Sequence, residues 1–188
     1  KKSVLLETSA RHAHLSRRVL DILFGEGYEL THKKTFPSPA SLPRTSDPGH
    51  WPKGQFPQRI DSRPGPPGNQ VELSATDARS IGLKPPVRES GDLKGSEVKI
   101  VGPKGEVELQ DGVIIAKRHI HATPADAEQY GLQDKQIVSV KVESDGRSLV
   151  FGDVVVRVSE KYALAMHIDT DESNAAGAVP GMMAEILD

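Results

Sequence analysis

Arg118-His-Ile-His-Ala-Thr-Pro124 is a short pattern that this chain uses more than once. Its first residues suit a β-strand, and its Thr-Pro end is typical of the start of a capped helix. Arg11-His-Ala-His-Leu-Ser16 repeats it, and Val71-Glu-Leu-Ser-Ala-Thr-Asp77 and His167-Ile-Asp-Thr-Asp-Glu-Ser173 follow it more loosely. We therefore expect one structural unit, a strand that runs into a Ser- or Thr-capped helix, to recur along the chain.

The rest of the sequence has the texture of a mainly β protein with short α-helices. Strand-like segments rich in β-branched residues span 98–101, 106–109, 113–120, 137–142, 149–158 and 163–168. Helices are expected at 16–24, 76–81 and 124–130, because each starts at a capping residue or proline and ends at a glycine. Many short strands with small helices favour one or two small β-barrels.

Composition excludes several classes of function. The 188 residues suit one ordinary domain or two small ones, and the net charge of −2 gives no reason to expect nucleic acid as a partner. No segment is long and apolar enough to predict a membrane span, and the N-terminus lacks the features of a signal peptide. The chain has no cysteine, so any metal must be held by histidine and carboxylate. Because the sequence starts at Lys1 rather than at methionine, we expect it to be part of a longer chain.

Histidines are the residues that carry chemistry in this pattern. Residues two apart on a strand share a face, so His12 with His14, and His119 with His121, can each present two imidazoles to one ion. His167 and Glu72 occupy related places in the repeat. A single His-x-His is more often structural than a ligand, but two such pairs predict two metal sites with three protein ligands each. Nitrogen donors suit Zn best, with Ni, Co and Cu as alternatives.

These motifs resemble the PduL-type phosphotransacylase (phosphate propanoyltransferase) family. The resemblance rests on 9–16, 70–79, 85–96, 116–121 and 166–177, in that order. It implies two small β-barrels that share a metal site at their interface. The first would comprise 8–30 plus 112–188, and the second would comprise 31–111. It also implies two metal ions, usually zinc, with His12, His14 and Glu72 as one ligand set and His119, His121 and His167 as the other.

The family also implies a reaction. A short acyl group, propanoyl for instance, would move between coenzyme A (CoA) and phosphate, giving acyl phosphate and free CoA. Without cysteine, direct attack of phosphate on the thioester is favoured over a cysteinyl acyl-enzyme. No catalytic residue is assigned, and Arg88 and Arg11 are candidates for binding phosphate, although a structural role is favoured for each. The alternatives are a metal-dependent hydrolase of thioesters or phosphoesters and a non-catalytic metal-binding barrel.

The same resemblance implies where the protein works and with what. It predicts a cytoplasmic enzyme of short-chain acyl metabolism such as propanediol degradation, or one inside a bacterial microcompartment with its shell or lumen enzymes. It also predicts a homo-oligomer. Acyl chain specificity and metal identity are left open by the sequence.

Residues 36–68 depart from the family pattern. Nine of the fourteen prolines fall there, with few apolar residues and no periodicity, as in a loop-like insertion. Codons can be chosen for this segment that, shifted by one base, spell residues typical of the family. Our hypothesis is that 36–68 is an out-of-frame translation bounded by small insertions or deletions, which would displace the family's phosphate-binding arginine.

Overall fold

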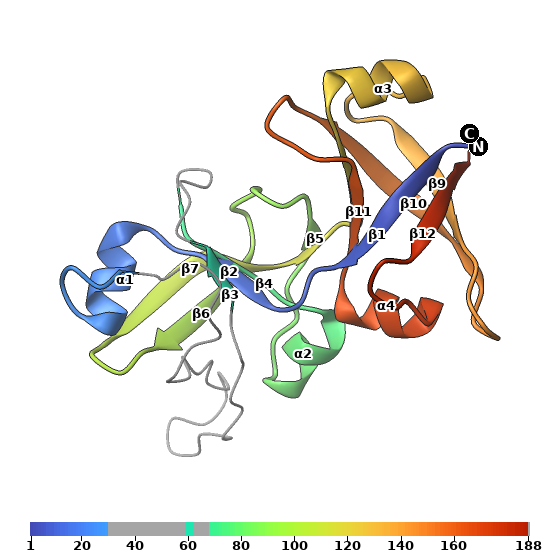
Figure 1. Ribbon diagram of the computed structural model, residues 1–188. Helices are drawn as coiled ribbons and strands as arrows, with labels where there is room; N and C mark the ends of the chain where they lie inside the picture. The colour runs from blue at the N-terminus through green and yellow to red at the C-terminus, as the bar shows by residue number, and fades with distance from the viewer. Residues whose placement is uncertain (30–58, 62–67, 188) are drawn as a thin grey trace. The chain divides into compact units, whose positions relative to one another are not determined.

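The computed structural model describes residues 1–29, 59–61 and 68–187, which divide into two units (Figure 1). Unit 1 comprises Lys1–Ser9 and Lys117–Asp188, and unit 2 comprises Ala10–Ala116. The sequence had placed 10–30 in the first barrel, but the structure places Ala10 onward in unit 2, because the strand there pairs with strands of that unit. Most of the anomalous segment 36–68 lies outside the described residues, so the hypothesis about its reading frame stays a prediction.

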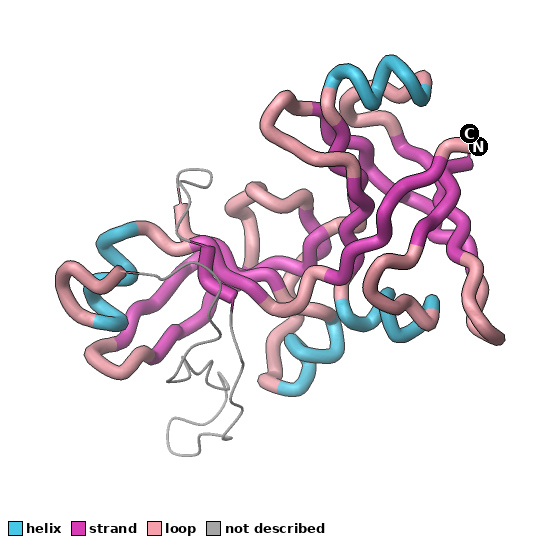
Figure 2. Tube along the Cα trace, viewed as in Figure 1, coloured by secondary structure: helices cyan, strands magenta, loops and turns pink. Residues whose placement is uncertain are grey.

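Unit 1 is a closed β-barrel (Figure 2). Its strands are β1 (Ser3–Thr8), β8 (His119–Ala122), β9 (Ile137–Val142), β10 (Leu149–Val158), β11 (Ala165–Ile168) and β12 (Met183–Leu187). They close in the order β1-β11-β8-β10-β9-β12. Side chains such as Ile120, Val140 and Met166 fill its interior, and burying each contributes about 1.5–3 kcal/mol. The barrel therefore has its own core.

Unit 2 is built on an open sheet over its described residues. Its strands are β2 (His12–His14), β3 (Arg59–Asp61), β4 (Gln70–Glu72), β5 (Val87–Arg88), β6 (Ser96–Val101) and β7 (Glu106–Ala116). The order is β3-β2-β4-β7-β5, and β6 pairs with β7. The mainly β fold is thus confirmed, with one closed barrel and one sheet that resembles half a barrel. A separate core of Leu20, Leu23, Val98 and their neighbours covers this sheet.

The two units contain the same arrangement of four strands. In unit 1, β10 runs parallel to β8, β8 antiparallel to β11, and β11 parallel to β1. In unit 2, β3 runs parallel to β2, β2 antiparallel to β4, and β4 parallel to β7. The recurrence seen in the sequence is therefore confirmed as a structural repeat.

Each short helix follows a strand of this repeat. The helices are α1 (Arg17–Phe24), α2 (Ala75–Ser80), α3 (Pro124–Tyr130) and α4 (Thr170–Ala176). Each begins after a polar cap, Ser16, Ser74, Thr123 or Asp169, whose side chain accepts a hydrogen bond from the backbone amide three residues on. Among the described residues, none of the helices has the length and apolar character that crossing a membrane requires. Each cap lies two residues after a candidate ligand position.

Candidate metal centres

His12, His14 and Glu72 form a compact group in unit 2. One potential ligand atom from each lies within 4.8 Å of the other two. Antiparallel pairing of β2 with β4 sets His12 directly opposite Glu72, and their Nε2 and Oε2 atoms are 3.1 Å apart. The His12 and His14 rings meet edge to face, with centroids 5.2 Å apart, because residues two apart on a strand share a face. The sheet register alone thus gathers two nitrogen donors and one carboxylate.

The geometry of His12 fixes which nitrogen faces Glu72. Its Nδ1 lies 3.0 Å from the carbonyl oxygen of Ala10, which can only accept, so Nδ1 carries the proton. In the neutral ring Nε2 then presents a lone pair to the Glu72 carboxylate. Two acceptors this close need a cation between them, either a proton or a metal ion. The chemistry of this donor set therefore fits a divalent metal of the zinc type.

Glu72 is held in its ionised form. Burial raises the pKa of its carboxyl, but when a proton on His12 Nε2 is the cation between the two groups, contacts from His12, Ser90 and His14 outweigh burial and lower that pKa to about 2. The Ser90 hydroxyl donates to Oε1, which leaves Oε2 toward His12. A carboxylate that stays charged across the physiological range is suited to bind a cation without first losing a proton.

Unit 1 brings His119, His121 and His167 together in the same way. Antiparallel pairing of β8 with β11 sets His119 opposite His167, as β2 and β4 set His12 opposite Glu72. The ring centroids lie 4.7 Å apart for His119 and His121, 4.6 Å for His121 and His167, and 5.2 Å for His119 and His167. The predicted ligands are thus adjacent within each unit.

Each imidazole of unit 1 has a different support. Nδ1 of His119 lies 2.8 Å from the carbonyl oxygen of Lys117, which repeats the contact of His12 with Ala10. Nδ1 of His167 faces Glu7 Oε2 at 3.6 Å, across the parallel pair of β1 and β11. The His121 ring stacks on Tyr162, with centroids 3.9 Å apart and planes 12° apart. Such contacts orient metal ligands in known sites, and the all-nitrogen donor set suits Zn.

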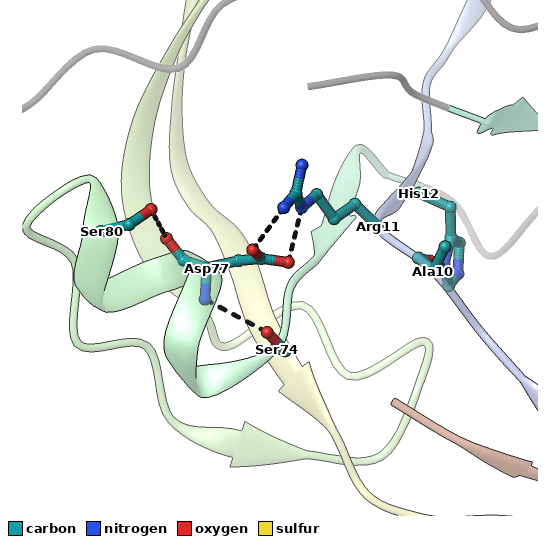
Figure 3. Close-up of polar contacts among 6 residues, drawn as sticks. All are labelled: Ala10, Arg11, His12, Ser74, Asp77 and Ser80. Atoms are coloured by element: carbon teal, nitrogen blue, oxygen red, sulfur yellow. Dashed lines mark hydrogen bonds and ion pairs between the residues drawn. The ribbon is translucent and has the colours of Figure 1, made fainter. Parts of the chain in front are cut away.

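The two arginines predicted to contact phosphate lie in different surroundings. Arg11 donates from Nε and one terminal nitrogen to both carboxylate oxygens of Asp77, each at 2.6 Å (Figure 3). Arg88 lies on β5 with its side chain exposed, 4.0 Å from an Asp92 oxygen. Arg11 is therefore engaged in a structural ion pair, whereas Arg88 faces solvent.

Several supporting residues could not be identified from the sequence. The carbonyls of Ala10 and Lys117, the Ser90 hydroxyl and the Tyr162 ring have no distinctive spacing relative to the ligands. An arginine does precede each His-x-His pair, and that repetition was a usable signal for Arg11 and Arg118 themselves, although not for the acids that they contact.

Comparison with known proteins adds an independent line of evidence. A family model described as phosphate propanoyltransferase matches residues 5–179. The phosphate propanoyltransferase of Thermotoga maritima is 48% identical over 189 residues, covering 98% of this chain and 89% of that protein. Those of Clostridioides difficile and Listeria monocytogenes are 47% and 45% identical, covering 97% and 98% of this chain and 88% and 87% of theirs. Matches of this extent include both candidate metal centres.

Proposed function

Because this chain belongs to the phosphate propanoyltransferase family, we propose that it interconverts a short-chain acyl-CoA plus phosphate with acyl phosphate plus CoA. Propanoyl-CoA is the first substrate to test, since the relatives are named for that acyl group. The observation that carries the proposal is the repeated ligand geometry, in which a His-x-His strand faces a third ligand at the same register in both units. We propose that each set binds one metal ion, most simply zinc.

The reaction needs little covalent chemistry from the protein. A phosphate oxygen attacks the thioester carbonyl, a C–O bond forms, the C–S bond breaks, and CoA leaves as a thiolate that takes up a proton. Metal ions bound at such sites would supply Lewis acidity toward the carbonyl and the leaving sulfur. The residues described above would hold those ions: His12, His14 and Glu72 in unit 2, and His119, His121 and His167 in unit 1. Glu72, charged throughout the neutral range, offsets part of the charge of its ion.

A cation is also needed to hold phosphate. Arg88 supports this role better than Arg11, because its guanidinium is exposed and Arg11 is paired with Asp77 through both carboxylate oxygens. We propose Arg88 as a phosphate contact.

The assay that tests the function measures thiol release from propanoyl-CoA with and without phosphate, on full-length protein whose metal content is determined in the same sample. We expect phosphate-dependent release with about two metal ions per chain, and loss of release in His119→Ala. In the same assay Arg88→Gln should raise the KM for phosphate, while Arg18→Gln, a change at an exposed arginine of α1, should not.

Other outcomes would point elsewhere. Thiol release at the same rate with and without phosphate would indicate a hydrolase. Bound metal in a protein that releases no thiol would indicate a metal-binding protein without this activity. Absence of metal would refute both centres, and an unchanged phosphate KM in Arg88→Gln would refute that assignment. Self-association and residence in the cytoplasm or a bacterial microcompartment are further proposals from the family resemblance; light scattering and cell fractionation test them.

A further inference from the structure

Each candidate ligand pair is preceded by an arginine that forms an ion pair with an acid from a distant part of its unit. Arg11, next to His12, contacts Asp77 through two hydrogen bonds of 2.6 Å (Figure 3). Arg118, next to His119, contacts Glu172 at 2.9 Å. These pairs are partly buried, with side-chain exposures of 31% and 12% in unit 2 and 32% and 18% in unit 1.

The acids occupy equivalent positions. Asp77 is the third residue of α2, which starts after cap Ser74, two residues beyond Glu72. Glu172 is the third residue of α4, which starts after cap Asp169, two residues beyond His167. The spacing from third ligand to cap to acid is therefore the same in both units. Two independent occurrences of one geometry argue against an accidental surface contact.

The ion pairs join the two segments that carry the ligands. In unit 2, the segment of His12 and the segment of Glu72 meet at the β2–β4 register and again at the Arg11–Asp77 pair. In unit 1, the segments of His119 and His167 meet at the β8–β11 register and again at Arg118–Glu172. Two points of attachment fix both the separation and the rotation of the strands.

The backbone contact of each first histidine lies next to its arginine. His12 donates from Nδ1 to the carbonyl oxygen of Ala10, and Arg11 is the residue between these two. Likewise, His119 donates from Nδ1 to the carbonyl oxygen of Lys117, and Arg118 lies between them. Arg118 is further held by the Phe151 ring, 5.2 Å from its guanidinium carbon. Movement of either arginine would tilt its preceding carbonyl and release Nδ1.

We propose that Arg11–Asp77 and Arg118–Glu172 are equivalent positioning pairs, each of which keeps the first histidine of its centre in the tautomer and orientation that present Nε2 to the metal. The inference rests on the proposed metal centres. Outer contacts of this kind change metal affinity by roughly 10–100-fold in known sites. Each pair should act on the centre of its own unit, because both of its residues lie on that unit's ligand segments.

The test measures metal affinity one centre at a time in the full chain. His121→Ala leaves the unit 2 centre, and His14→Ala leaves the unit 1 centre. Zn²⁺ dissociation constants are then measured by competition with a chromophoric chelator after adding Asp77→Asn or Glu172→Gln to each background. Asp21→Asn and Glu143→Gln are the matched controls, since each breaks an exposed ion pair in unit 2 or unit 1 without touching a ligand segment.

We expect Asp77→Asn to weaken Zn²⁺ binding by about 10-fold or more in the His121→Ala background and to leave it unchanged in the His14→Ala background. Glu172→Gln should give the reverse result, and neither control should change affinity. Nitrogen-detected NMR of metal-free protein at pH 8 supplies a second readout. The first histidine of the affected unit should change from one tautomer to a mixture, which a general loss of stability would not produce.

The outcomes separate this inference from the proposed function. If neither single-centre background binds Zn²⁺, the metal centres themselves are refuted. If both bind and the two acid variants match their controls, the centres stand and the positioning role is refuted. Equal weakening at both centres, with unchanged tautomers, would also overturn it, because it would indicate global destabilisation.

Discussion

Single carbonyl groups fix the orientation of His12 and His119. In both residues a backbone oxygen two positions earlier accepts from Nδ1, so the choice of tautomer follows from local chain geometry. His121 is oriented differently, because the Tyr162 ring stacks on its imidazole. The Arg157 guanidinium carbon lies 5.8 Å from the centroid of that Tyr162 ring.

The Tyr162 ring should contribute to metal affinity through packing alone. Tyr162→Ala would remove the ring that stacks on His121 and so loosen its orientation, and we expect Zn²⁺ at the unit 1 centre to bind about 10-fold more weakly. Tyr162→Phe keeps the stacked ring, so its affinity should match the wild type. Isothermal titration in the His14→Ala background measures this. A weakening in Tyr162→Phe as large as in Tyr162→Ala would show that the hydroxyl matters instead.

At the scale of elements, α3 and α4 use the same capping box in different surroundings. In α3, the Thr123 hydroxyl and backbone amide donate to Asp126 and lower the pKa of that carboxyl. In α4, burial raises the pKa of Glu172 more than its partners lower it. The two acids should therefore affect stability with opposite pH dependence.

Because the pKa of Asp126 is lowered, ionised Asp126 adds to the free energy of unfolding above the ordinary carboxyl pKa. This contribution is lost as the pH falls through the lowered pKa of the folded protein. Asp126→Asn should therefore have a lower free energy of unfolding than the wild type near neutral pH, and this difference should become smaller as the pH falls. The raised pKa of Glu172 makes its ionised form unfavourable to folding, so Glu172→Gln should gain stability relative to wild type as pH rises toward neutrality. Denaturant unfolding of the metal-free full chain between pH 3 and 7 measures both. Parallel trends in the two variants would contradict this account.

Elements with complete local signals were predictable from sequence. Pro124–Tyr130, Ile137–Val142 and Leu149–Val158 have the bounds expected from their caps, glycines and valine content. The prediction of one strand over 113–120 was wrong, because the chain leaves unit 2 after Ala116 and starts a different strand at His119. Tertiary pairing creates that break, and no turn residue marks it. The candidate ligands are visible in the sequence as His-x-His pairs, whereas Asp77 lies 66 positions from Arg11 and no local spacing connects them.

At the scale of the whole molecule, the residues of each proposed ligand set belong to one unit. We expect His14→Ala and His121→Ala each to leave about one metal ion per chain. At a free Zn²⁺ concentration of 100 times the dissociation constant, the remaining ion should stabilise its own unit by about 2.7 kcal/mol. Amide hydrogen exchange with and without Zn²⁺ resolves this by unit. In His14→Ala, protection should rise in β8 and β11 and stay constant in β2 and β4. A uniform rise would show that the units unfold together.

The order of the strands along the chain also determines when each strand of unit 1 can pair during synthesis. β1 is made before unit 2, whereas its partners β11 and β12 are made after unit 2, with Leu5 opposite Ala165 and Met183. All of Ala10–Ala116 emerges from the ribosome in between. Translation adds roughly 5–20 residues per second, so several seconds or more separate the synthesis of β1 from that of its partners. During that time the described strands of unit 2 already have their own partners available. The nascent chain thus carries β1 without its barrel partners until β11 and β12 have also been made.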